Sequence, residues 1–306
     1  MWPKRQPQIR NLASKLISYS STRRDLPGIA SDPARLTLAT QMVASLRRLD
    51  YTRILQSRSI DPRRMAPDNA LFDPERAAIL QARLGNIDEA FWLLFLATHF
   101  GKHGVHGWRR VRDAYSGLES GIWTWERVSC DKGAFRQWLA TNEARIKGAF
   151  GNHRKYETLR SDSRASTATV VESYIDWVGP ERSHAVLCQR LIREGGNDPH
   201  SIFDKFYTSM NVARFGRLAK FDFLALIGRL DLAPIGPGAA YLKEATGPLR
   251  GARLLFGGSS LAAISADNLE QELTALDAEL QVGMQVLEDS LCNWQKSPTR
   301  FVHFRG

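Results

Sequence analysis

Cysteine is scarce in this chain, with three in 306 residues. Cys130, Cys188 and Cys292 lie far apart, and no two of them have the C-x-x-C spacing of zinc or iron–sulfur ligands. Such an odd, scattered set argues against a structural zinc or an iron–sulfur cluster and indicates a reducing compartment. The sequence also has no P-loop and no G-x-G-x-x-G, so we expect neither a metal nor a cofactor.

Long hydrophobic runs are missing as well. The longest apolar stretch, Ala90–Ala97, is far shorter than the ~20 residues that span a bilayer. The N-terminal sequence MWPKRQPQIR lacks the apolar segment of a secretory signal peptide. We therefore expect a cytoplasmic protein that does not enter a membrane.

Alternating strand patterns are also lacking, and helical patterns dominate. The fold class expected is therefore mostly α, with 1–72 an Arg-rich N-terminal segment of short helices and loops and 73–306 the helical body. The prolines Pro27, Pro33, Pro62 and Pro67 interrupt the first segment, although Leu36–Leu49 has helical spacing. Arg253–Phe256 and Phe301–Phe304 are candidate extended pieces, and Ser161–Ser166 is a candidate linker. The patterns predict helices over 74–84, 87–100, 106–116, 132–148, 167–178, 182–194, 200–208, 218–230, 238–245 and 266–296.

Positive charge is abundant: 42 lysines and arginines face 32 acids, which gives a net charge of +10. A surplus of this size favours a polyanionic partner, although a basic surface without such a partner is also common.

One segment, Leu232–Tyr241, resembles a helix–hairpin–helix turn. It follows the apolar run Phe221–Leu230, and its Gly236-Pro237-Gly238 allows a sharp turn without side chains that block a phosphate. Backbone amides at the start of a following helix would bind that anion. A proline-kinked pair of core helices has a similar sequence.

Histidines cluster after the apolar run. His99, His103 and His106 have the i, i+4, i+7 spacing of one helical face, but glycines interrupt the segment and no H-E-x-x-H occurs. Phosphate contact through Lys102, Arg109 and Arg110 fits this segment better than a metal, and an ordinary helix end fits equally well.

Two further clusters combine cations with aromatic residues. Phe150–Glu157 places Arg154 and Lys155 beside Tyr156, as phosphate contact with base stacking requires. Arg214, Arg217 and Lys220 lead towards the hairpin. Asp222 follows them, either as a helix N-terminal acid or as a carboxylate of the site.

The C-terminal segment Gly283–Lys296 has an apolar stripe and a polar stripe at helical spacing. The polar stripe is either a solvated face or a surface that recognises a base edge, with a carboxylate that stabilises positive charge on the reacting sugar. Its members are Gln285, Asp289, Asn293 and Lys296.

With these motifs the chain resembles the alpha-glutamyl/putrescinyl thymine pyrophosphorylases, clade 3, within the DNA-glycosylase-like helix–hairpin–helix superfamily. The sequence segments that carry this resemblance, called the matching segments below, are AFWLLFLATHFGKH, FGNHRKYE, RFGRLAKFDFL, ATGPLRGARLLFGG and VGMQVLEDSLCNWQKSP. The resemblance implies a two-lobed helical body that grips duplex DNA and acts on one extruded, modified base. Phage relatives are inferred to replace a pyrophosphate on 5-hydroxymethylated uracil with an amine.

The chain departs from the ordinary glycosylase pattern at two positions. Gly238 stands where bifunctional glycosylases have the nucleophilic lysine, and Phe256 stands where the usual aspartate falls. Schiff-base chemistry is therefore not expected, and the carboxylate has moved or is not needed there. The candidates for a relocated catalytic acid are Asp289, Asp222 and Glu288.

From the sequence we expect a monomeric DNA glycosylase that flips out a hypermodified base of phage DNA and hydrolyses its glycosidic bond, in anti-phage defence. The alternatives are a base-modifying transferase of the pyrophosphorylase type and a non-catalytic DNA-binding module. The expected base pocket is His99, Gln285, Asn293 and Trp294. The expected contacts to double-stranded DNA are Gly236, Gly238, Lys102, Arg154, Lys155, Arg214, Arg217, Lys243, Arg250 and Lys296.

Overall fold

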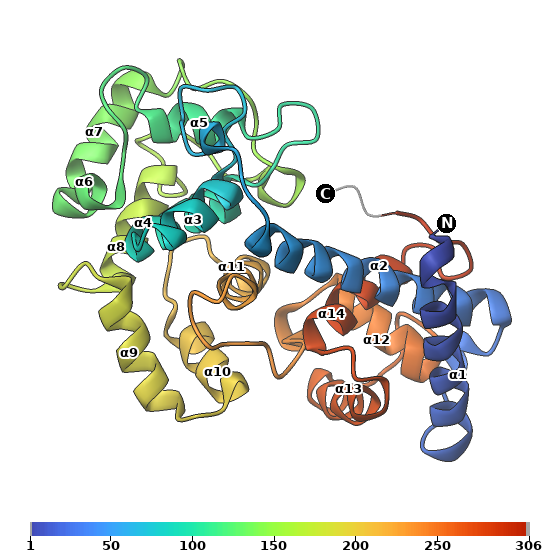
Figure 1. Cartoon of the computed structure of the whole chain (residues 1–306). Helices are drawn as coiled ribbons and strands as arrows, with labels where there is room; N and C mark the ends of the chain where they lie inside the picture. The colour runs from blue at the N-terminus through green and yellow to red at the C-terminus, as the bar shows by residue number, and fades with distance from the viewer. Residues whose placement is uncertain (1, 304–306) are drawn as a thin grey trace. The chain divides into compact units, whose positions relative to one another are not determined.

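The computed structural model describes residues 2–303, and these contain fourteen α-helices, five short 3₁₀-helices and no β-strand (Figure 1). The expected mostly α fold class is confirmed. The described chain forms two compact units, one made of residues 2–52 with 237–303 and the other of residues 53–236. This partition by packing differs from the expected sequence segments 1–72 and 73–306. Nowhere in residues 2–303 does an apolar helix reach the length that crossing a bilayer requires.

The first unit joins the two ends of the chain. It contains α1 (Gln6–Thr22), most of α2 (Asp32–Ser57), α12 (Gly247–Gly257), α13 (Ala266–Leu280) and α14 (Met284–Trp294). Their apolar faces share one core in which Leu16, Leu38 and Leu273 are completely buried. Sequestering such side chains from water is the main favourable contribution to folding.

Two glycines allow α12 and α14 to pack closely. A Cβ atom on Gly251 would lie 2.4 Å from the carbonyl oxygen of Leu291, and one on Gly247 would lie 2.6 Å from Cys292 Sγ. Side chains at either position would push the helices apart. Two of the matching segments, ATGPLRGARLLFGG and VGMQVLEDSLCNWQKSP, therefore form one packed helix pair, α12 and α14.

The second unit is built around α4 (Ile87–Phe100). This helix packs against α3 (Pro74–Arg83), α5 (Arg109–Ser116), α6 (Trp125–Cys130), α9 (His184–Gly195) and α11 (Arg217–Arg229). Aromatic side chains dominate its core, and the rings of Phe95 and Tyr174 stack with centroids 3.7 Å apart. The other helices of this unit are α7 (Lys132–Asn142), α8 (Thr167–Val178) and α10 (Pro199–Ser209).

A chain of hydrogen-bonded polar side chains connects α4, α8 and α9. Tyr174 Oη of α8 lies 2.7 Å from His184 Nε2 of α9, and His184 Nδ1 lies 2.7 Å from Asp88 Oδ1 of α4. Burial lowers the pKa of His184, although the hydrogen bond to Asp88 opposes this. These contacts give hydrogen-bond partners to the polar atoms of Tyr174 and His184, which would otherwise be costly to bury.

Several predicted elements are wrong. The N-terminal segment contains a 17-residue and a 26-residue helix instead of short pieces, because their apolar faces are covered within the first unit. The predicted helix 266–296 is two helices, since Gln281 and Gly283 adopt positive φ angles that a helix cannot contain. The predicted helix 132–148 ends at Asn142, α6 was missed, and Arg253–Phe256 lies in α12 instead of an extended piece. Phe304 of the other extended candidate lies outside the described residues.

The predicted helix 238–245 is also wrong. After α11 the chain runs without regular structure to a 3₁₀-helix at Leu242–Glu244, and α12 begins only at Gly247. Gly236 and Gly238 have no positive φ angle, and a Cβ atom on Gly236 would meet nothing within 4 Å. The glycine that this turn requires is Gly228 of α11, where a Cβ would lie 2.1 Å from the Ile235 carbonyl oxygen.

Candidate functional site

Three of the matching segments, AFWLLFLATHFGKH, FGNHRKYE and RFGRLAKFDFL, lie close together in the second unit. Phe100 ends α4, and its carbonyl oxygen accepts a hydrogen bond of 2.8 Å from the Gly151 N–H. The rings of Phe100 and Phe150 stack with centroids 5.4 Å apart. A Cβ atom on Gly151 would lie 2.9 Å from the Gly101 carbonyl carbon, so the two backbones touch. The segment that contains FGNHRKYE is thereby fixed against the C-terminal end of α4.

Arg154 connects this contact to α11. Its Nε donates a hydrogen bond of 2.8 Å to the carbonyl oxygen of Thr98, and its Nη2 lies 3.7 Å from Asp222 Oδ2. Only 11% of the Arg154 side chain is exposed. Burial lowers the pKa of Arg154, whereas the nearby Asp222 and Glu157 raise it. A guanidinium held in this way provides a fixed positive charge at the surface of the site.

Asp222 is the carboxylate that these three matching segments place beside Arg154. It lies in the second turn of α11 and 49% of its side chain is exposed. The position excludes the alternative of an acid in the first helical turn. The protein around the carboxyl group raises its pKa by displacing water, while Arg154, His153, Arg217 and Arg229 lower it. Asp222 is thus accessible to solvent and is a better proton acceptor than an ordinary aspartate.

Glu75 is a second carboxylate in a similar environment. It lies in the first turn of α3, whose N-cap Asp73 accepts a hydrogen bond from the Arg76 N–H. Loss of water around Glu75 raises its pKa, and the charge of Asp73 adds to this, while Arg229 and Lys102 lower it. Because Arg229 acts on both Glu75 and Asp222, the two carboxylates share one cluster of positive charge.

Sequence patterns did not single out Glu75 or Arg229. Glu75 stands in the sequence DPERAAIL, which indicated only the start of a helix, and Arg229 ends an apolar run. The relation of Glu75 to Asp222 depends on how α3 and α11 pack around α4, which no local pattern contains. Arg229, by contrast, follows Asp222 by seven residues, about two turns along the same helix.

His99 lies in the core of the second unit and directly follows Thr98, whose carbonyl oxygen accepts the hydrogen bond from Arg154. It is 1% exposed, its Nε2 is 3.0 Å from Thr167 Oγ1, and its Nδ1 has no hydrogen-bond partner among the described residues. Burial, together with the charges of Arg154 and Arg214, lowers the pKa of His99 to about 3. His99 is therefore neutral, and its ring supports the wall of the site instead of facing solvent.

The other expected contacts of this unit lie around the cluster. Arg214 pairs with Glu157 at 3.4 Å, and Arg217 is buried beside the Phe221 ring. Lys155 and Lys102 are exposed, near the rings of Tyr156 and Trp108 respectively. Tyr156 is 75% exposed and so presents an aromatic face beside a cation.

Part of the expected hairpin lies in the same unit. Gly236 is bonded to Pro199 and His200: its N–H donates to the Pro199 carbonyl, and its carbonyl oxygen lies 2.9 Å from His200 Nδ1. Residues 237–241 belong to the first unit, where the amide groups of Ala240 and Leu242 donate to the carboxylate of Glu270. These amides already have an anionic partner within the protein.

The remaining expected residues lie in the first unit. Asp289 of α14 pairs with Arg48 of α2 and accepts a hydrogen bond of 2.9 Å from Asn293 Nδ2. Glu288 is 7% exposed, and Trp294 is fully buried with its Nε1 bonded to the carbonyls of Ala34 and Pro298. Gln285 is half-buried. Lys243, Arg250 and Lys296 are exposed.

Residues 2–303 contain no group of three histidine, cysteine, aspartate or glutamate side chains that is arranged to hold a metal ion. His103 and His106 stack on each other with centroids 4.9 Å apart, beyond the glycine that ends α4. The three histidines thus do not share a helical face.

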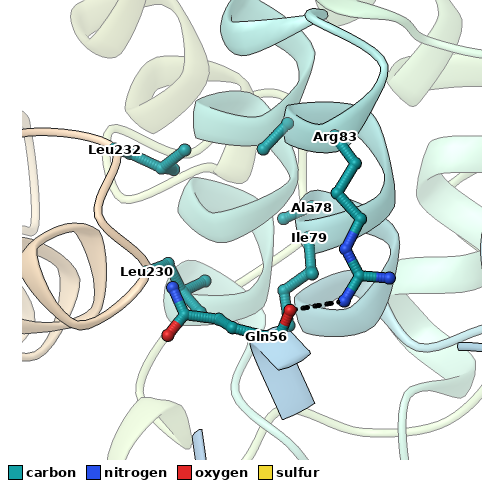
Figure 2. A pocket seen from close by; sticks show the side chains of 7 residues that line it. Gln56, Ala78, Ile79, Arg83, Leu230 and Leu232 are labelled. Carbon is teal, nitrogen blue, oxygen red and sulfur yellow. Dashed lines mark hydrogen bonds between the residues drawn. The ribbon is translucent and has the colours of Figure 1, made fainter. Parts of the chain in front are cut away.

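A pocket of about 240 Å³ lies between α3 and the end of α11. Figure 2 shows Leu230 and Leu232 facing the helix that carries Ala78 and Ile79. Its one charged side chain, Arg83, donates to the backbone carbonyls of Leu55, Gln56 and Arg58. This pocket is mostly apolar and offers less chemistry than the cluster around Asp222.

Comparison with known proteins gave one match. The family model described as alpha-glutamyl/putrescinyl thymine pyrophosphorylase clade 3 matches residues 33–306. No curated protein and no solved structure matches the chain.

Proposed function

From the premise that the chain belongs to the alpha-glutamyl/putrescinyl thymine pyrophosphorylase family, clade 3, we propose that it is a transferase that modifies a thymine-type base in DNA. In the proposed reaction an amine attacks the 5-methylene carbon of a uracil that carries a pyrophosphate there. A C–N bond forms, the C–O bond to pyrophosphate breaks, and the amine gives up a proton.

The expectation of a DNA glycosylase that hydrolyses the glycosidic bond is wrong. The family to which the chain belongs is named for a pyrophosphorylase, which alters the base and leaves it attached to its sugar. The related expectations of a hydrolase and of base excision in anti-phage defence fall with it.

The observation that supports the proposal is the pairing of Asp222 with Arg154 at 3.7 Å. The charge of Arg229 also acts on Asp222, and the charges of Arg229 and Lys102 act on Glu75. Transfer requires groups that stabilise the negative charge of departing pyrophosphate, and fixed guanidinium and ammonium groups do this. It also requires a base that removes the amine proton, and a carboxylate with a raised pKa suits this step. We assign the first role to Arg154 and Lys102 and the second to Asp222.

DNA as the substrate is part of the same proposal. Support comes from the net charge of +10 and from the exposed Lys155 beside the exposed ring of Tyr156. Cations near a solvent-facing aromatic ring suit a phosphate contact with an adjacent stacked base. Lys243, Arg250 and Lys296 are proposed as further phosphate contacts on the first unit.

The helix–hairpin–helix assignment also stays a proposal. Its support is the sequence of Leu232–Tyr241 between two helices, α11 and α12. Asp289 and Glu288, with Gln285, Asn293 and Trp294, remain proposed site residues on α14, although Asp289 is already paired with Arg48.

The test uses a duplex oligonucleotide with one 5-(pyrophosphoryloxymethyl)uracil and a mixture of amino acids and putrescine. We expect release of pyrophosphate that depends on both the amine and the protein. Arg154→Gln should slow this release. Arg127→Gln is the matched control, because Arg127 lies over the Trp123 ring away from the cluster. Pyrophosphate release that is unaffected by Arg154→Gln would contradict the proposed role.

A further inference from the structure

Phe215 lies between Arg154 and the aromatic core of the second unit. It is 4% exposed, and the Cζ atom of Arg154 lies 6.0 Å from the centroid of its ring. Guanidinium groups pack on the faces of aromatic rings, which attract positive charge. Because Phe215 is buried, its ring does not reach a substrate and can influence the site only through Arg154.

Polar contacts fix Arg154 only in part. Its Nε donates to the Thr98 carbonyl oxygen at 2.8 Å, but its Nη2 is 3.7 Å from Asp222 Oδ2, which is longer than a hydrogen bond. These two contacts define where Nε lies and leave the plane of the guanidinium free to tilt. An aromatic ring packed against the guanidinium restricts this tilt.

The Phe215 ring is itself held from several sides. It stacks on Phe95 with centroids 5.0 Å apart and on His99 with centroids 6.4 Å apart, and both of these rings belong to α4. It also meets Phe223 of α11 edge to face at 6.4 Å, and Phe223 directly follows Asp222. Phe215 therefore connects α4 to the helix that carries the carboxylate, and the neutral His99 adds no positive charge to this group of rings.

The backbone before Phe215 has an unusual conformation. The Phe215 N–H donates to the Val212 carbonyl oxygen at 3.1 Å and closes a turn, within which Arg214 has a φ of 64°. Glycine or asparagine is favoured at such a position, so an arginine there is strained. The Ala213 N–H donates to Ser173 Oγ of α8 at 2.9 Å and holds the turn in place. Strain of this kind persists where the surrounding structure imposes it, often at functional sites.

We infer that Phe215 is a positioning residue for Arg154. Its ring, held by Phe95 and Phe223, keeps the guanidinium in the orientation that brings Nη2 towards Asp222. On the basis of the proposed function, this oriented charge is the one that stabilises departing pyrophosphate. Without the ring the guanidinium tilts, and Arg154 loses part of its contribution to anion binding.

A double-mutant cycle in pyrophosphate affinity tests this inference. The full-length protein, without DNA, is titrated in a calorimeter with inorganic pyrophosphate at up to about 10 mM. Phe215→Leu keeps the position apolar but removes the ring face, and we expect it to weaken binding about fivefold. The same change in the Arg154→Gln protein should have no further effect, because the group that the ring orients is absent. Phe215→Met, which also fills the position with a flexible apolar side chain, should give the same results.

Phe135→Leu is the matched control, since Phe135 is a buried ring of α7 that packs against Trp123 and Trp138. Thermal unfolding of each variant verifies that it is folded. Pyrophosphate affinity that Phe215→Leu leaves unchanged, or lowers equally with and without Arg154, would overturn the inference, as would a parent protein that binds no pyrophosphate. Release of pyrophosphate from DNA is measured separately. Its absence would contradict the transferase, whereas coupling of Phe215 to Arg154 in the binding of free pyrophosphate would still support the inference.

Discussion

Gly151 and Gly101 lie in backbone contact, so close that a Cβ atom on Gly151 would be 2.9 Å from the Gly101 carbonyl carbon. Gly101 has a φ of 65°, which also favours glycine. This contact fixes the segment that carries Arg154 against the end of α4 and thereby places Arg154 near Asp222.

Gly151→Ala should therefore destabilise the protein. The added methyl group meets backbone atoms that cannot rotate away, and such overpacking costs about 1–3 kcal/mol. Urea unfolding measures the effect. Gly104→Ala is the control, because a Cβ atom there would meet nothing within 4 Å. Equal stability of the two variants would show that the glycine contact is looser than described.

Glu270 should be important for the segment before α12. Its carboxylate accepts hydrogen bonds from the Ala240 N–H at 2.9 Å and the Leu242 N–H at 2.5 Å. Glu270→Ala leaves both amides without this partner, which should lower the free energy of unfolding by about 1–3 kcal/mol. Glu244→Ala, which removes an exposed carboxylate of the nearby 3₁₀-helix, should change it little. Indistinguishable variants would contradict the prediction.

His99 should make stability depend on pH. Its pKa is about 3 in the folded protein, below the ordinary 6.5. As the pH falls from 6.5 towards 3, the unfolded chain gains a proton at this position that the folded protein does not bind. Stability should fall over this window by up to about 1.4 kcal/mol per pH unit.

The variant His99→Gln isolates this contribution, because His184 titrates in the same direction in both proteins. Between pH 7 and pH 5, the variant should lose about 2 kcal/mol less stability than the parent protein in urea unfolding. The same loss in both proteins would mean that His99 binds a proton in the folded state.

Asp222 should set the acid limb of the pH–rate profile. Because the protein around its carboxyl group displaces water and so raises its pKa, transfer should increase with pH through a value above the ordinary ~3.9 of an aspartate. Asp222→Asn should lower the transfer rate by about 10²- to 10⁴-fold and remove this limb. Asp176→Asn, at an exposed ion pair with Lys132, should leave the profile unchanged. A profile that Asp222→Asn leaves intact would assign the proton to another group.

The sequence predicted best those elements whose signals are local. The helices predicted at 87–100 and 167–178 coincide with α4 and α8, because a long apolar run, a Ser166 cap and terminal glycines define them. It failed at α12, where close packing on α14 requires the glycines that, in the sequence alone, indicate a turn.

The site was predicted in part for the same reason. Arg154, Arg214 and Asp222 lie in the matching sequence segments, and the structure brings them together with His99. Glu75 belongs to another helix, α3, and only tertiary packing relates it to Asp222 and Arg229 of α11.

The central claim is that the protein forms a carbon–nitrogen bond on a base that stays in the DNA. Its most direct test is mass spectrometry of nucleosides from the 5-(pyrophosphoryloxymethyl)uracil duplex after incubation with protein and ¹⁵N-labelled amines. We predict a deoxynucleoside that contains ¹⁵N in place of the pyrophosphate, in an amount equal to the pyrophosphate released. Abasic sites with a free modified base, or only 5-hydroxymethyluracil formed by water, would contradict the account.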